Sequence, residues 1–120
     1  TCYDEFTINV RKGYEYYLTN FFTENGLPKY YHDRLYPIDM HSIAQSIFTL
    51  TELKHLDTSS TNLALKIIAW AIANMHSKTG YFYYQKNRII KNRISFMRWS
   101  QAWMLRALSY IGVKNEANCK

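Results

Sequence analysis

Glycine and proline are scarce in this chain, with four and two copies among 120 residues. Disordered, collagen-like and low-complexity segments need more of these residues, so those classes are excluded. Apolar residues make up 48% of the chain and aromatic residues 17%, including eleven tyrosines and three tryptophans. At this length we expect one domain with a real hydrophobic core. The chain begins Thr-Cys-Tyr, without methionine, and we expect it to be part of a longer protein.

Cysteine is also scarce, since only Cys2 and Cys119 occur, at opposite ends of the chain. They form no CxxC motif and no cysteine–histidine spacing suited to zinc, so we expect neither a metal nor a cofactor. Either a disulfide joins neighbouring termini or the two thiols are incidental. Two cysteines are too few to indicate a secreted disulfide framework, so the compartment stays open, with the cytoplasm favoured.

No long hydrophobic run is present. The longest, 63–75, is interrupted by Lys66 and Asn74, whereas a membrane-spanning helix needs about 20 predominantly apolar residues. We therefore expect no membrane span, and no signal peptide is visible in the sequence.

Acidic residues are absent between Asp57 and Glu116. Residues 1–57 carry eight acids and five bases (net −3), and residues 58–120 carry ten bases and one acid (net +9), which together give the net charge of +6. Such a field attracts anions, for example acidic sugars, phosphates, nucleic acid or an acidic protein surface. The alternative is a solvated basic face, or a basic half that other parts of a parent chain balance.

Apolar residues recur at spacings of three and four in four segments, which predicts four helices. The expected ranges are 4–22, 38–56, 62–76 and 96–112, with a polar tail at 113–120. The third helix is apolar on nearly all sides, so we expect it to be packed on nearly all sides. Between the last two helices, the aromatic run 81–84 and the segment 88–94 predict a short β-hairpin or an ordered loop.

Both halves of the chain follow the order helix, glycine, aromatic loop, basic residues and helix. Gly26 and Gly80, 54 residues apart, follow the first helix of each half, and Asp39 and Arg98, 59 apart, open the second helices. This period indicates two αα-hairpin repeats, which stack because a single hairpin cannot bury both faces. The alternative is a chance likeness between two hairpins. The repeats would span about 4–56 and 58–112.

The sequence GYFYY (80–84), followed by FMRWSQAWM (96–104), resembles the last hairpin of an α/α-toroid protein. The segment LYPIDMHS (35–42) resembles the loop and helix start of the preceding hairpin. This superfamily includes unsaturated glycuronyl hydrolases, N-acylglucosamine 2-epimerases and polysaccharide-biosynthesis proteins. A closed toroid has six hairpins, so the resemblance implies that this chain is the C-terminal portion of one: an all-α fragment with two αα-hairpins.

The resemblance also implies a glycan-related parent protein that recognises or processes an acidic or amino sugar polymer. Such a parent is a glycoside hydrolase, a lyase-associated hydrolase or a sugar epimerase, whereas we expect this chain alone not to be catalytic. Some chains of this type carry the label delta-aminolevulinic acid dehydratase. Those enzymes are TIM barrels, and no alternation of strands and helices occurs here.

In an α/α toroid, the loops that lead into the inner helices line the pocket mouth, which places 30–41 and 81–103 there. Asp39 and His41 can serve as acid and base on a sugar, or as a helix cap and a surface histidine that face different ways. The expected ligand-binding residues are Arg98 for a carboxylate or phosphate, Gln101 for a hydroxyl, and the aromatics Tyr36, Tyr81, Tyr83, Tyr84, Trp99 and Trp103, with Tyr30 and Tyr31 on the same rim. The alternatives are core packing for the tryptophans, an inter-repeat seam for the tyrosines and a solvated Gln101.

Two other functions stay open. A helical-repeat scaffold can bind a peptide, another subunit or a second copy of itself through exposed aromatic surface. The basic residues of 86–93, next to aromatic residues, suit single-stranded nucleic acid, although no known nucleic-acid-binding module is present. Glycine-rich phosphate loops, GxSxG and HExxH are absent, and the second half has no interior acid for a glycosidase pair.

Overall fold

The computed structural model describes residues 2–117 of the chain, and the side chains of residues 6–113. This part forms four α-helices, one π-helical turn and three short strands. The expectation of a mostly helical chain with a short β-hairpin is confirmed. The helical elements are α1 (Cys2–Asn20), α2 (Met40–Glu52), α3 (Ser60–Met75), the π-helical turn η1 (Met97–Gln101) and α4 (Ala102–Ala117).

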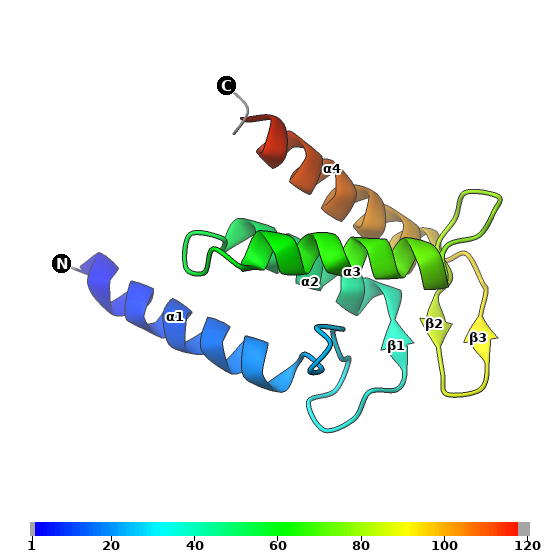
Figure 1. Cartoon of the computed structure of the whole chain (residues 1–120), viewed down its shortest axis with the longest axis horizontal. Coiled ribbons are helices and arrows are strands. Elements are labelled where there is room, and N and C mark those ends of the chain that lie inside the picture. Colours follow the sequence, from blue (N-terminus) through cyan, green and yellow to red (C-terminus); the bar gives the residue numbers. More distant parts are fainter. Residues whose placement is uncertain (1, 118–120) are drawn as a thin grey trace.

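The helices form two antiparallel pairs. α1 and α3 run in one direction, and α2 and α4 run in the opposite direction (Figure 1). α2 is the central helix because it packs against both α3 and α4. Alanines in the contact faces of all three helices let the backbones approach closely, so the core is dense. Its buried residues are Ile43, Ala44, Ile47 and Leu50 of α2, Ala64, Ile67, Ala71 and Met75 of α3, and Met104, Ala107 and Ile111 of α4.

Three two-residue strands lie at the end of the molecule where α2 and α4 begin (Figure 1). They are β1 (Ile38–Asp39), β2 (Gln85–Lys86) and β3 (Lys91–Asn92), antiparallel in the order β1-β2-β3. The expected hairpin is therefore β2–β3, and it begins just after the aromatic run. The third strand was not expected, because β1 pairs with a segment that is distant in the sequence.

The same turn follows α1 and α3, 54 residues apart. An antiparallel bridge between Phe22 and Pro28 closes the first turn, and one between His76 and Phe82 closes the second. Within each turn, three backbone hydrogen bonds join equivalent residues, with donor–acceptor distances between 2.7 and 3.0 Å. The two halves of the described chain thus share their backbone conformation at this point.

Two of the expected helices have wrong boundaries. The helix expected at 38–56 is shorter, because 38–39 pair with β2 and the chain turns after Glu52. The helix expected to end at Gly112 continues to Ala117, because an interior glycine costs a helix only about 1 kcal/mol. Part of the expected polar tail is therefore helical. Residues 118–120, and with them the question of a Cys2–Cys119 disulfide, lie outside the described residues.

The expectation that the third helix is packed on nearly all sides is also wrong. Leu65 and Ile72 of α3 are exposed, and so are the apolar residues Phe6 and Val10 of α1. Two hairpins are too few to surround an outer helix, so each outer helix keeps one open apolar face.

Two tyrosine hydroxyls join α1 to the other helices. Tyr14 shares a hydrogen bond with the hydroxyl of Ser60 in α3, and Tyr17 shares one of 2.8 Å with the hydroxyl of Ser46 in α2. Both serines are buried. Burial raises the pKa of Tyr14 and of Tyr17, and in each case outweighs the opposite effect of the serine hydrogen bond.

We predict that the contact of α1 with the other helices through Tyr14 and Tyr17 weakens in alkali. The unfolded chain loses phenolic protons near the ordinary pKa of about 10, before the folded chain does. The two tyrosines therefore contribute their full stabilisation below that pH, and the protein loses this contribution as the pH rises toward the folded-state pKa. Urea denaturation from neutral pH to about pH 11 measures this slope. Tyr14→Phe with Tyr17→Phe should flatten it, whereas Tyr16→Phe on the exposed side of α1 should not. If stability falls with pH as steeply in the double variant as in the wild type, these two tyrosines do not cause the loss.

A matched pair of glycine substitutions tests the packing of the first turn. Gly26 and Gly80 have φ of 79° and 97°, so alanine at either site costs about 1–2 kcal/mol in backbone strain. A Cβ at Gly26 would also lie 2.6 Å from Leu63 Cδ1, whereas one at Gly80 meets nothing within 4 Å. We predict that Gly26→Ala lowers the free energy of unfolding more than Gly80→Ala does. Equal losses by urea denaturation would show that α3 does not pack on the first turn.

Candidate functional site

A cleft of about 400 Å³ opens at the start of α2. Tyr30 comes from the loop after α1, and Asp39 and His41 flank the first residue of α2. The remaining walls come from the second half of the chain. They are Tyr84 and Gln85 beside the hairpin and Trp99 of η1. The sheet assembles the cleft, because β1 and β2 pair Asp39 with Gln85 and the N–H of Met40 donates to the Tyr84 carbonyl at 3.0 Å.

Asp39 is the cap of α2, and it is only 4% exposed. Its Oδ1 accepts hydrogen bonds from the backbone N–H groups of His41 (2.9 Å) and Ser42 (3.3 Å). Its Oδ2 accepts one from Nε2 of Gln85 at 2.8 Å. The capping role is therefore confirmed, and the same carboxylate couples the first helix turn to the hairpin.

His41 lies against two tryptophans. Its ring centroid is 5.8 Å from that of Trp99 and 5.0 Å from that of Trp103. The capping alternative describes Asp39, whose extended backbone lies outside the helix, and both Asp39 and His41 line the cleft. Nδ1 of His41 is the one buried side-chain nitrogen or oxygen in the described chain that has no hydrogen-bond partner.

The two tryptophans differ in exposure. Trp99 is 58% exposed and presents its indole at the cleft. Trp103 is half-buried against the core, and the Arg106 guanidinium carbon lies 5.3 Å from its ring centroid. The core-packing alternative therefore describes Trp103 and not Trp99.

Tyr84 supplies a phenol that stays protonated. Burial raises its pKa, and the negative charge of Asp39 and the neighbouring phenol of Tyr30 raise it further. Its ring meets that of Phe96 edge-on at 4.8 Å. Tyr84 is therefore a hydrogen-bond donor at the rim of the cleft across the whole physiological pH range.

Gln101 does not face a ligand in this structure. Its Oε1 accepts from the N–H of Phe82 at 2.9 Å, and its Nε2 donates to the Phe82 carbonyl at 2.6 Å and to the Ser100 hydroxyl at 2.9 Å. Both ends of the amide thus hold the second turn against η1. The sequence assigned Gln101 to a ligand hydroxyl or to solvent, and the structure places it in neither position.

Four other expected ligand-binding residues lie outside this cleft. Arg98 lines a neighbouring hollow of about 330 Å³ together with Trp103 and Arg106. The rings of Tyr81 and Tyr83 contact each other with centroids 5.8 Å apart, and Tyr36 packs against the core.

Gln85 was not expected in the site. It reaches the cleft only because β2 pairs with β1, and no local sequence pattern marks that pairing.

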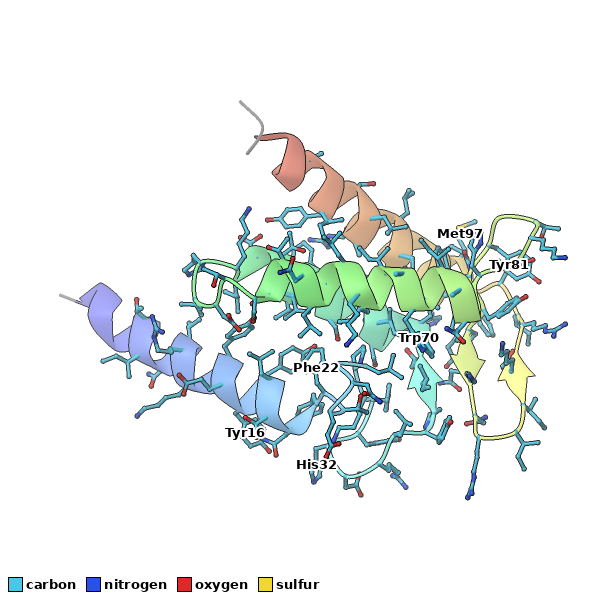
Figure 2. All side chains as sticks on the ribbon, in the orientation of Figure 1. Tyr16, Phe22, His32, Trp70, Tyr81 and Met97 are labelled. Carbon is cyan, nitrogen blue, oxygen red and sulfur yellow. The ribbon has the colours of Figure 1, made fainter. Side chains whose placement is uncertain are left out.

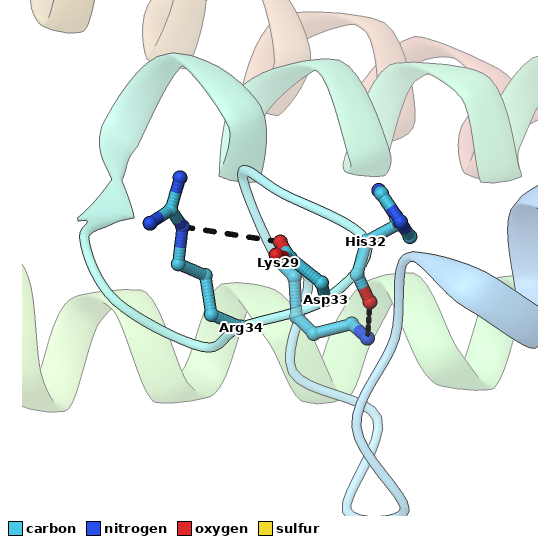
Figure 3. A network of polar contacts seen from close by, with 4 residues as sticks. All are labelled: Lys29, His32, Asp33 and Arg34. Carbon is cyan, nitrogen blue, oxygen red and sulfur yellow. Dashed lines mark hydrogen bonds and ion pairs between the residues drawn. The ribbon is translucent and has the colours of Figure 1, made fainter.

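The loop that carries Tyr30 is held by local contacts (Figure 3). Nζ of Lys29 donates to the His32 carbonyl at 2.6 Å, and Nε of Arg34 lies 3.8 Å from Oδ1 of Asp33. These groups are mostly exposed, so their contribution to stability is small. The loop places Tyr30 at the rim of the cleft, where its ring contacts that of Tyr31.

Comparisons with protein-family models, with curated proteins and with solved structures find no match to this chain. No group of three or more histidine, cysteine, aspartate or glutamate side chains able to hold a metal gathers within the described residues. No helix between residues 2 and 117 has the length and apolar character needed to cross a membrane.

We predict that Gln101→Ala destabilises the protein by about 1–3 kcal/mol, because it leaves the buried Phe82 backbone groups without partners. Gln101→Glu should also destabilise it, since a carboxylate accepts from the Phe82 N–H but cannot donate to its carbonyl. Arg98→Ala, an exposed neighbour, serves as the control. Thermal denaturation of the three variants measures this, and a wild-type melting temperature for Gln101→Glu would contradict the two-bond arrangement.

Proposed function

We propose that this chain is a two-hairpin portion of an α/α toroid, and that its cleft binds one sugar ring of an acidic or amino sugar polymer. One observation carries the proposal. The cleft places the exposed indole of Trp99 and the phenols of Tyr30 and Tyr84 around a buried carboxylate and an imidazole.

The arrangement of helices supports the toroid part of the proposal. α2 and α4 lie side by side and run in the same direction, with α1 and α3 outside them (Figure 1). The segments that lead into α2 and α4 meet at one end of this array, where the cleft opens. Inner helices that start at a common pocket mouth are what the sequence resemblance implies.

The chemistry of the cleft suits a sugar. A pyranose has an apolar C–H face, which packs on an indole, and a rim of hydroxyls, which need donors and acceptors. The Tyr84 phenol offers a donor to these hydroxyls, and the imidazole of His41, whose buried Nδ1 has no hydrogen-bond partner, lies beside the cleft. Asp39 completes the set with an acceptor that favours an amino or N-acetylamino group over a second anion.

The neighbouring hollow, whose Trp103 contacts His41, suits the acidic part of such a polymer. Arg98 and Arg106 line it together with Trp103, and the chain carries a net +9 over residues 58–120. The Arg106 guanidinium is already seated over aromatic rings, with its carbon 4.7 Å from the Phe48 ring centroid. A carboxylate on the next sugar would meet two guanidinium groups there.

Binding, and not cleavage, is the activity that these residues support alone. Glycoside hydrolysis uses a pair of carboxyl groups on either side of the scissile bond. Among the described residues that line the cleft, Asp39 is the only acid, and its oxygens already accept three hydrogen bonds. A second acid would have to come from another part of a parent protein.

The test is a titration with an oligosaccharide of alternating uronic acid and N-acetylated amino sugar, followed through the tryptophan indole N–H signals by NMR. We expect millimolar binding or tighter, and about tenfold weaker binding, or ~1.4 kcal/mol, for Trp99→Ala. Met97→Ala is the matched control, because Met97 is an exposed neighbour in η1 that does not line the cleft.

Two outcomes would sink this proposal. One is no binding at millimolar sugar, and the other is equal affinity for the wild type and Trp99→Ala. Preference for a single-stranded oligonucleotide, with an affinity that falls steeply with salt, would instead favour a nucleic-acid function for the basic half.

A further inference from the structure

The turn after α3 lacks the cover that the turn after α1 has. In the first half, α3 packs over the turn so closely that a Cβ on Gly26 would lie 2.6 Å from Leu63 Cδ1. Trp70 of α3 lines the hollow beside the same turn (Figure 2). In the second half, a Cβ on Gly80 meets nothing within 4 Å. The two turns have the same backbone hydrogen bonds, so the difference lies in what covers them.

An apolar groove of about 330 Å³ marks the uncovered turn. The second turn, η1 and α4 form its walls, and Leu105 on its rim is 69% exposed. Met97 beside it is also exposed. The groove is lined by Gly80, Phe82, Met97, Gln101, Ala102, Leu105 and Leu108.

The opposite end of the molecule carries the matching surface. Ser60 and Trp70 lie on the side of α3 that faces the first hairpin, where Ser60 bonds to Tyr14. The residues 54 positions earlier are Phe6 and Tyr16 of α1. Phe6 is 65% exposed, and Tyr16 points away from the other helices (Figure 2). α1 thus presents outward two aromatic residues at positions where α3 faces its neighbour, with Asn9 at the position equivalent to Leu63.

The charges of the two ends are complementary. α1 carries three acids and two bases (net −1), and residues 76–117, which include the groove, carry eight bases and one acid (net +7). Contact between α1 of one molecule and the groove end of another is therefore attractive, whereas contact between two groove ends is repulsive.

We infer that a second copy of this chain docks head to tail, with its α1 seated on the groove beside Gly80 as α3 is seated on the turn at Gly26. The α1 face and the groove are different surfaces, so each copy leaves one of each free and further copies add in series. This inference goes beyond the proposed function, and it does not depend on sugar binding.

The experiment is sedimentation velocity of the full chain over a range of concentrations, with two single variants. Leu105→Glu places a charge in the groove, and Phe6→Glu places one on the α1 face. Both sites are exposed, so folding should persist, and circular dichroism checks this. Ile89→Glu, at the exposed hairpin tip, is the control. We expect concentration-dependent association for the wild type and the control, and monomers for each variant alone.

Mixing the two variants tests whether the copies associate head to tail. Leu105→Glu keeps an intact α1 face and Phe6→Glu keeps an intact groove, so the mixture should form a one-to-one dimer that grows no further. Added salt should weaken this dimer, because complementary charge contributes to it. A monomeric wild type at every soluble concentration would overturn the inference. So would association of either variant alone to the wild-type extent, or a mixture that stays monomeric.

Discussion

The structure depends on the burial of α2 between α3 and α4. No other helix contacts two neighbours so extensively, and Ile43, Ile47 and Leu50 have no exposed surface. The contact brings helices from both halves of the sequence together, so neither hairpin has a core of its own. The open faces of α1, α3 and α4 follow from the same arrangement, because only a helix between two neighbours is fully covered.

The start of α2 links this packing to the cleft. The Asp39 carboxylate caps the helix with one oxygen and holds Gln85 of the hairpin with the other. The same group is therefore needed by the fold and also lines the cleft. Three hydrogen bonds to this buried carboxylate fix its orientation beside the cleft.

Helical periodicity predicted the four helices, because the 3.6-residue repeat of apolar side chains is a local property of the sequence. The glycines at 26 and 80 marked the two turns for a similar reason, since only glycine adopts their positive φ without strain. Gln85 and the bonded state of Gln101 could not be predicted in this way. Both depend on partners at least 19 residues away, which no short-range pattern encodes.

The sequence by itself determined the helical content, the 54-residue spacing of the turns and the charge difference between the halves. Each of these depends on residue types and on spacing along one chain. Only the tertiary structure decided which apolar faces are buried and which stay open, because burial depends on how many helices surround each one. It also decided that Asp39, His41 and Trp99 share one cleft, since the pairing of β1 with β2 brings two distant loops to the start of the same helix.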